Sequence, residues 1–131
     1  MPHKLKYRVL PERLAVCRAM SEGAFLGFAL GGKLSCLVRT PEEFSCVCEE
    51  SLIAQEREGL RIEEGWVALK LEGPFAFEMT GVLASFIEPL AAAGIPIFAI
   101  STFDTDYVLV KREGLEQAIA ALGAVGHERL D

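Results

Sequence analysis

The sequence contains no asparagine, only two histidines and no apolar run long enough to cross a membrane. Its longest apolar stretch, residues 89–100, includes Gly94 and two prolines, and it falls short of the ~20 residues that a spanning helix requires. Basic residues are also scarce, because 13 lysines and arginines stand against 19 aspartates and glutamates. These shortages exclude a membrane span and argue against a nucleic-acid partner, which would need a basic face.

The same absences bear on catalysis. An acylphosphatase needs an arginine in a phosphate cradle and an asparagine to orient water, and only the arginines, such as Arg18 and Arg39, are present. We expect His3 to lie in a mobile terminal segment and His127 to have a partly exposed structural role. No GxSxG motif is found. We therefore expect no enzyme and no cofactor, and acylphosphatase chemistry remains a remote alternative.

Composition predicts a cytoplasmic protein with a real core. The first 13 residues lack the apolar segment and cleavage site of a signal peptide, and four cysteines without a secretory context favour reduced thiols. Hydrophobic residues make up 51% of the chain, which can fill the core of one domain or of two very small ones. The surplus suits a protein interface, and we expect a homodimer.

Apolar periodicity predicts the secondary structure. A helix begins after Thr80, expected as its N-cap, and ends at Gly94. We expect this helix to be disturbed at Pro89, because proline lacks the N–H that would bond to Ser85. Further helices are expected at residues 24–30, 49–58 and 115–122. Strands are expected at residues 5–10, 14–18, 34–40, 43–48, 60–64, 66–72, 95–101, 106–110 and 125–130.

The two halves of the chain repeat one pattern. Residues 34–48 and residues 96–110 each read as a strand, an acidic turn with a threonine, and a strand. Thr40 then matches Thr102, and Glu43-Phe44 matches Asp106-Tyr107 if the first turn is one residue shorter. We predict an α+β fold of two ferredoxin-like βαββαβ modules in tandem, with antiparallel sheets and helices on one face. The degenerate first module would cover residues 1–65 and the second residues 66–131.

Strand directions place two polar segments at one end of the second module. The loop before Thr80 leads to a helix N-terminus, whose free amides favour an anion, and the turn at residues 102–105 carries Asp104 and precedes Asp106, which favour a cation. A small zwitterion would satisfy both demands, and Phe103 could cover it. The alternative is that the two aspartates merely shape a hairpin turn.

The cysteines permit a second hypothesis. If the first hairpin is centred on Pro41, Cys36 lies opposite Cys46, and Cys48 shares their face. Three thiols on one sheet face could bind a soft metal or become oxidised. Because no CxxC motif or histidine completes such a site, we expect buried, inert thiols and no metal.

Residues 66–122, with LPERLAVCR and VRTPEEFSCVCEE from the first half, resemble the ACT-domain proteins of the small tandem type. The motif TGVLA...PLA..GI...AISTFDTDYVLV links them to the CASTOR cytosolic arginine sensors of animals. The resemblance implies two ACT modules that bind a free amino acid at a module interface and regulate another protein without catalysis. It assigns Thr102, Phe103 and Asp106 to the ligand, together with the loop at residues 73–81.

One loop position differs from the sensors. They place a glutamate two residues before the helix glycine, where this chain has Met79, while Glu78 stands one position earlier. Arginine and a neutral or apolar amino acid therefore both remain open as ligands, and so does a pure oligomerisation module with a vestigial pocket. The candidate ligand-binding residues are Glu78, Met79, Thr80, Gly81, Val82, Thr102, Phe103, Asp104 and Asp106.

Overall fold

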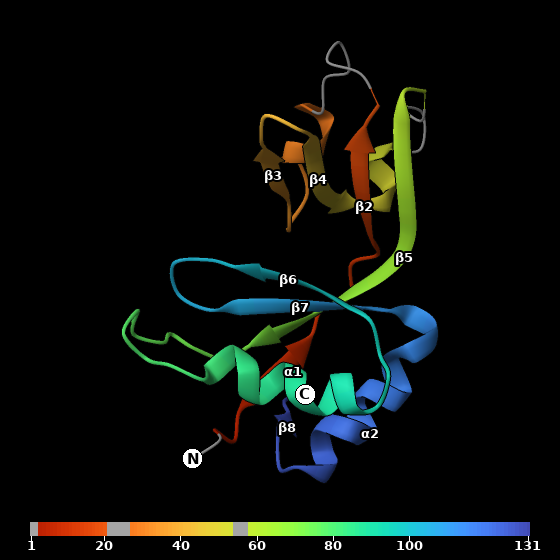
Figure 1. Ribbon diagram of the computed structural model, residues 1–131. Coiled ribbons are helices and arrows are strands. Elements are labelled where there is room, and N and C mark those ends of the chain that lie inside the picture. Colours follow the sequence, from red (N-terminus) through yellow and green to blue (C-terminus); the bar gives the residue numbers. More distant parts are fainter. Residues whose placement is uncertain (1–2, 21–26, 54–57) are drawn as a thin grey trace. The chain divides into compact units, whose positions relative to one another are not determined.

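The computed structural model in Figure 1 describes residues 3–20, 27–53 and 58–131. The chain forms two compact units. The insert unit comprises Glu12–Trp66, and the C-terminal unit comprises Val67–Asp131 together with Met1–Pro11. The repeat in the sequence instead predicts residues 1–11 as part of the first module. They join the C-terminal unit because strand β1 (Lys6–Val9) pairs antiparallel with the end of β5 (Leu60–Leu71).

The C-terminal unit has the predicted βαββαβ order, which starts at the second half of β5. The sheet runs β6-β7-β5-β1-β8, so β1 is an additional strand between the first and last strands of the motif. It pairs antiparallel with β5 and parallel with β8. The elements after β5 are α1 (Val82–Ala92), β6 (Ile97–Ser101), β7 (Asp106–Lys111), the 3-10 turn η3 (Arg112–Gly114), α2 (Leu115–Ala124) and β8 (Glu128–Arg129).

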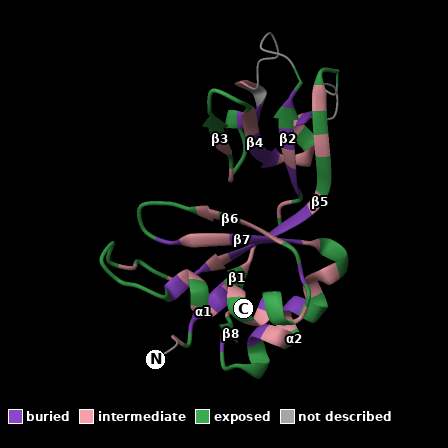
Figure 2. Cartoon of the chain, viewed as in Figure 1, coloured by how far each residue is buried: buried purple, intermediate pink, exposed green. Residues whose placement is uncertain are grey.

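Both helices of this unit cover one face of its sheet, as predicted, and the buried residues lie between the two layers (Figure 2). Phe86 of α1 is fully buried and meets Tyr7 of β1 edge to face, with ring centroids 5.3 Å apart. Leu90 and Leu122 bring the two helices against the same core. Apolar side chains at helical spacing therefore fix which face of α1 meets the strands.

The described residues of the insert unit repeat the same strand order, with 3-10 turns where the C-terminal unit has helices. Its sheet runs β3-β4-β2-β5, which is the order of the βαββαβ motif. Where helices were expected, residues 27–30 and 50–53 form 3-10 turns, while residues 24–26 and 54–57 lie outside the described part. This is the degenerate module that the sequence predicts. Its other elements are β2 (Leu14–Ala19), η1 (Gly27–Leu30), β3 (Cys36–Arg39), β4 (Phe44–Glu49) and η2 (Glu50–Ile53).

The register of the first hairpin corrects the expected cysteine pairing. Cys36 lies opposite Val47, and Leu37 lies opposite Cys46. The prediction that Cys36 faces Cys46 is therefore wrong by one residue, and such a slip moves a side chain to the other face. The third thiol on the face of Cys46 and Cys48 is that of Cys17, which pairs with Cys46 across β2 and β4.

Pro89 does not interrupt α1, contrary to expectation, because a histidine replaces its missing N–H. The helix continues to Ala92, and the Ser85 carbonyl accepts a hydrogen bond of 2.8 Å from Nε2 of His127. On the other side of the ring, Nδ1 accepts the backbone N–H of Leu5 at 3.0 Å. Because a carbonyl only accepts and an amide only donates, these partners require the neutral Nε2–H tautomer. The buried His127 side chain therefore connects α1 to the residue that precedes β1. The expected structural role is confirmed, but the expected partial exposure is wrong.

Among the residues that the structure describes, no helix is long and apolar enough to cross a membrane.

Candidate functional site

The turn between β6 and β7 is built on a threonine. Thr102 donates its backbone N–H to the carbonyl of Thr105 at 2.8 Å, and its hydroxyl lies 3.1 Å from the same oxygen. The N–H of Thr105 approaches that hydroxyl at 3.3 Å. Ser101 and Asp106 form the last strand pair before the turn. A side chain that bonds the backbone in this way fixes the turn independently of any ligand.

Two hydrogen bonds fasten this turn to the rest of the C-terminal unit. The buried Thr105 hydroxyl donates to the carbonyl of Leu71, at the end of β5, at 2.8 Å. The N–H of Phe75 donates to the carbonyl of Asp104 at 2.9 Å. The prediction that the turn and the loop before α1 lie at the same end of the module is therefore confirmed.

The two aspartates of this end are differently arranged. Asp106 is half-buried, and its carboxylate accepts the Ser101 hydroxyl at 2.6 Å. Asp104 has an exposed side chain and contributes its carbonyl to the link with Phe75. Asp106 is thus the carboxylate whose position is fixed by a neighbour, which suits it to hold a cationic group in a defined place.

Helix α1 begins differently from the prediction. Its N-cap is Gly81, at φ 80° and ψ 0°, without a side-chain capping bond, so the assignment of Thr80 as N-cap is wrong. A positive φ is costly for threonine and costs glycine nothing, which explains the shift by one residue. The carbonyl of Gly81 accepts the N–H of Ser85, so the amides that precede Ser85 in the helix stand at its open N-terminus, beginning with Val82.

His3 forms hydrogen bonds at the start of this helix from an unexpected direction. Its Nε2 donates to the Thr80 carbonyl at 2.9 Å, and its backbone N–H donates to the Ser85 hydroxyl at 3.0 Å. That hydroxyl in turn donates to the Gly81 carbonyl at 2.7 Å. The expectation of a mobile His3 is therefore wrong. No local pattern could have revealed this contact, since the two partners lie 77 positions apart.

Two exposed phenylalanines flank the site. Phe77 of the loop and Phe103 of the turn are 75% and 78% exposed, and their rings meet edge to face at 4.7 Å. Met79 is 48% exposed on the same loop, and the neighbouring Glu78 side chain is exposed as well. The sequence favours a ligand contact for Phe103 and a core position for Phe77, and the exposure of Phe77 shows that the second expectation is wrong. The structure thus joins the loop and the turn through an aromatic contact as well as through the backbone.

The insert unit has its own version of the turn. Thr40 donates its N–H to the carbonyl of Glu43 at 2.9 Å, and its hydroxyl lies 3.0 Å from the N–H of Glu43. The register pairs Arg39 with Phe44, as it pairs Ser101 with Asp106. The two turns have the same length, so Phe44 corresponds to Asp106. The expected shorter first turn, with Glu43 matched to Asp106, is wrong.

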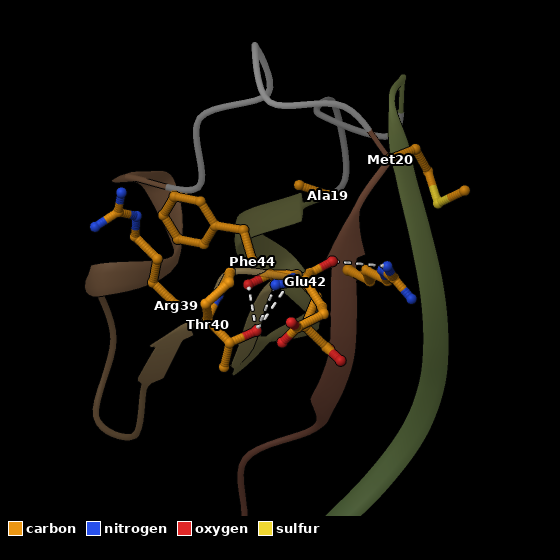
Figure 3. A pocket seen from close by; sticks show the side chains of 9 residues that line it. Ala19, Met20, Arg39, Thr40, Glu42 and Phe44 are labelled. Atoms are coloured by element: carbon orange, nitrogen blue, oxygen red, sulfur yellow. Dashed lines mark hydrogen bonds between the residues drawn. The ribbon is translucent and has the colours of Figure 1, made fainter.

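The two turns therefore differ in chemistry at this position. The insert unit has an aromatic side chain at the position of the fixed carboxylate, although its turn borders a cavity of about 540 Å³ (Figure 3). The Arg18 guanidinium donates to the Glu42 carbonyl at 3.2 Å beside that cavity. The cavity is lined by Arg18, Ala19, Met20, Arg39, Thr40, Pro41, Glu42, Glu43 and Phe44.

Comparisons with known proteins agree with this architecture. The family model of the ACT domain matches residues 61–124. The human protein CASTOR3P is 31% identical over 117 residues, which cover 80% of this chain and 72% of that protein. The human "Cytosolic arginine sensor for mTORC1 subunit 1" is 38% identical over 60 residues, or 45% of this chain, and that match spans only 18% of the sensor.

A solved structure is similar over nearly the whole length. The crystal structure of a protein from Agrobacterium tumefaciens is 37% identical and superposes with a TM-score of 0.87, covering 98% of this chain and 93% of that one. Similarity therefore extends across both units.

Proposed function

The chain belongs to the ACT-domain family and is related to the CASTOR proteins, and on that premise we propose that it is a regulatory protein that binds a free amino acid without transforming it. The observation that carries the proposal is that hydrogen bonds hold the turn at residues 102–105 against the end of β5 and the loop before α1. One element contributes carboxylates and the other a helix N-terminus, which are the two demands of an amino acid's ammonium and carboxylate groups.

In this proposal the α-ammonium binds Asp106, with Asp104 nearby in the sequence as a second negative charge. The α-carboxylate binds backbone amides at the start of α1, from Thr80 through Gly81 to Val82, where the helix dipole favours an anion. Hydrogen bonds with an ionised donor or acceptor are stronger than neutral ones, so these contacts would supply most of the specific affinity.

The ligand side chain would lie against Phe103 and the loop. Phe77, Phe103 and Met79 offer apolar contact area to a neutral side chain, whereas Glu78 offers a carboxylate to a guanidinium. The curated relative named an arginine sensor supports arginine, and Met79 at the position of the sensors' glutamate supports a neutral or apolar amino acid. We propose both as ligand classes for the test below.

Regulation would follow from association. A ligand held between modules of two copies of the chain binds the associated form more tightly, and it shifts the population toward that form. We propose a cytoplasmic homodimer that acts on a separate regulated protein. The curated relative described as cytosolic supports that location.

Isothermal titration of the full chain with each free amino acid, one at a time, tests the proposal. We expect one amino acid, or one chemical class, to bind. Asp106→Asn keeps an oxygen that can accept the Ser101 hydroxyl but removes the charge, so it should weaken binding by about 10- to 100-fold, the loss of one hydrogen bond to a charged group. Glu116→Ala, which removes an exposed acid at the start of α2, is the matched control and should bind normally.

The absence of heat and of thermal stabilisation with every amino acid would overturn the proposal. That outcome favours the second candidate, an interaction module whose pocket is vestigial. The specific observation for this candidate is the exposed pair of Phe77 and Phe103, which is unusual for a surface without a partner. Sedimentation of the Phe77→Ser variant distinguishes the two candidates. Only the interaction module is expected to self-associate without any amino acid and to lose that self-association in this variant.

A further inference from the structure

Three cysteine thiols meet in the interior of the insert unit. Cys17 on β2 lies opposite Cys46 on β4, and Cys48 is two residues further along the same strand face. Their sulfur atoms all lie within 4.8 Å of one another, and the three residues are only 0–2% exposed. We call this group the thiol cluster.

The spacing of the thiol cluster suits a single central ion. Sulfur atoms that bind one ion through bonds of about 2.3 Å lie no more than about 4.6 Å apart. Small rotations of the cysteine side chains would close the remaining gap. Cys36 does not take part, because it pairs with Val47 and therefore shares the opposite face.

The surroundings of the thiol cluster determine which charge it tolerates. Alanines and Ile53 enclose the sulfurs in an apolar core. An apolar core solvates ions poorly, so the net charge of a complex decides whether the site can hold it.

A net negative charge in such a site is therefore unfavourable. Three thiolates around a monovalent ion carry two negative charges, and around a divalent ion they carry one. Only a trivalent ion leaves a neutral complex. Among ions that prefer sulfur ligands, this condition selects arsenic(III) and its heavier analogue antimony(III).

We propose that Cys17, Cys46 and Cys48 form a binding site for a trivalent thiophilic ion, held as a neutral complex with three sulfur ligands. With arsenous acid, As(OH)₃, each thiol gives up its proton, each As–O bond breaks, and each As–S bond forms. Three water molecules leave, and the oxidation state of arsenic does not change. Because the sulfurs are buried, uptake requires a local opening of the unit, and binding is slow compared with diffusion.

The test uses the full chain, kept reduced with a phosphine that carries no thiol. After incubation with arsenite and gel filtration, we expect one arsenic per chain by mass spectrometry and three sulfur neighbours by X-ray absorption. Val108 and Val110 occupy the positions on β7 that correspond to Cys46 and Cys48, so valine is compatible with this fold at both. Cys46→Val should leave two sulfur ligands and lower the affinity by about 100-fold or more, since even outer-shell losses at metal sites cost 10- to 100-fold.

Cys36→Val is the matched control, and it should retain the stoichiometry and three sulfur neighbours. Thermal unfolding of each variant shows whether it is folded, and Cys17→Ala provides a second disruption if the valine variants melt early. The proposal is overturned if the reduced chain binds no arsenic, if arsenic has fewer than three sulfur neighbours, or if Cys36→Val weakens binding as much as Cys46→Val.

Discussion

Replacement of His127 by alanine should destabilise the C-terminal unit strongly. The imidazole donates to the Ser85 carbonyl at 2.8 Å and accepts the Leu5 N–H at 3.0 Å, and it lies 5.4 Å from the Phe86 ring. Each buried backbone group that loses its partner costs about 1–3 kcal/mol. Loss of the ring also leaves a cavity beside Phe86. We therefore expect the free energy of unfolding to fall by about 3–5 kcal/mol, a large part of the typical total for a small domain.

A second substitution isolates the contact to Ser85. Pro89 has no N–H, and alanine at position 89 would supply the one that an ordinary helix directs to the Ser85 carbonyl. Pro89→Ala should therefore restore about 1–3 kcal/mol in the His127→Ala background. In the unmodified protein it should stabilise less, because His127 already satisfies that carbonyl. The two substitutions should thus show a coupling free energy of about 1 kcal/mol or more.

Urea unfolding of the four proteins, followed by circular dichroism at one pH, measures this cycle. His127→Gln is a control that keeps a polar amide in place of the ring. Additive effects of the two substitutions would show that His127 does not replace the missing N–H of Pro89. A loss of stability below about 1 kcal/mol for His127→Ala would refute the claim that the Ser85 carbonyl and the Leu5 N–H both depend on the imidazole.

A Cβ on Gly73 would lie 2.9 Å from the Asp104 carbonyl oxygen, so Gly73→Ala should destabilise the protein by about 1–3 kcal/mol in thermal unfolding. Gly123 lies inside α2 with open space around it, so Gly123→Ala should instead stabilise the protein by about 0.5–1 kcal/mol in the same assay. Unfolding should also become easier in alkali. Burial raises the pKa of Tyr7 above 10.0, and chiefly a hydrogen bond with Cys17 raises the pKa of Cys48 from 9.0 to about 12. The native state holds these protons more tightly, so stability is full below about pH 9 and falls as the pH rises toward 12. Urea titrations should show a shallower fall for Cys48→Val, and an unchanged slope would contradict this assignment.

Local patterns in the sequence were sufficient for much of the fold. The helical stripe ending at Gly94 and the two threonine hairpins appear where periodicity predicts them. Strand directions alone brought the loop before α1 to the turn at residues 102–105, which the bond between Phe75 and Asp104 confirms. These features depend on neighbours in the chain, whose side chains alternate or recur with a fixed period.

Long-range pairing was beyond such patterns. Nothing near β1 specifies that Tyr7 lies opposite Leu71 rather than beside a strand of the first half. A turn centred on Pro41 would pair Cys36 with Cys46, but the turn has an even number of residues, which shifts every pair by one. The place of His3 near a terminus likewise predicts a mobile side chain, although its partners at the start of α1 hold it.

The interruption of the C-terminal unit by residues 12–66 has a consequence for synthesis on the ribosome. In the described part of the insert unit, β2, β3, β4 and the first half of β5 pair with one another, so this unit can fold as soon as it emerges. Strand β1 emerges earlier but must wait, since the bond from Leu5 to His127 spans 122 positions. Lys6 and Arg8 place positive charge on this waiting strand. Charged residues on an unpaired strand oppose its association with other nascent chains, so they protect β1 until its partners are made.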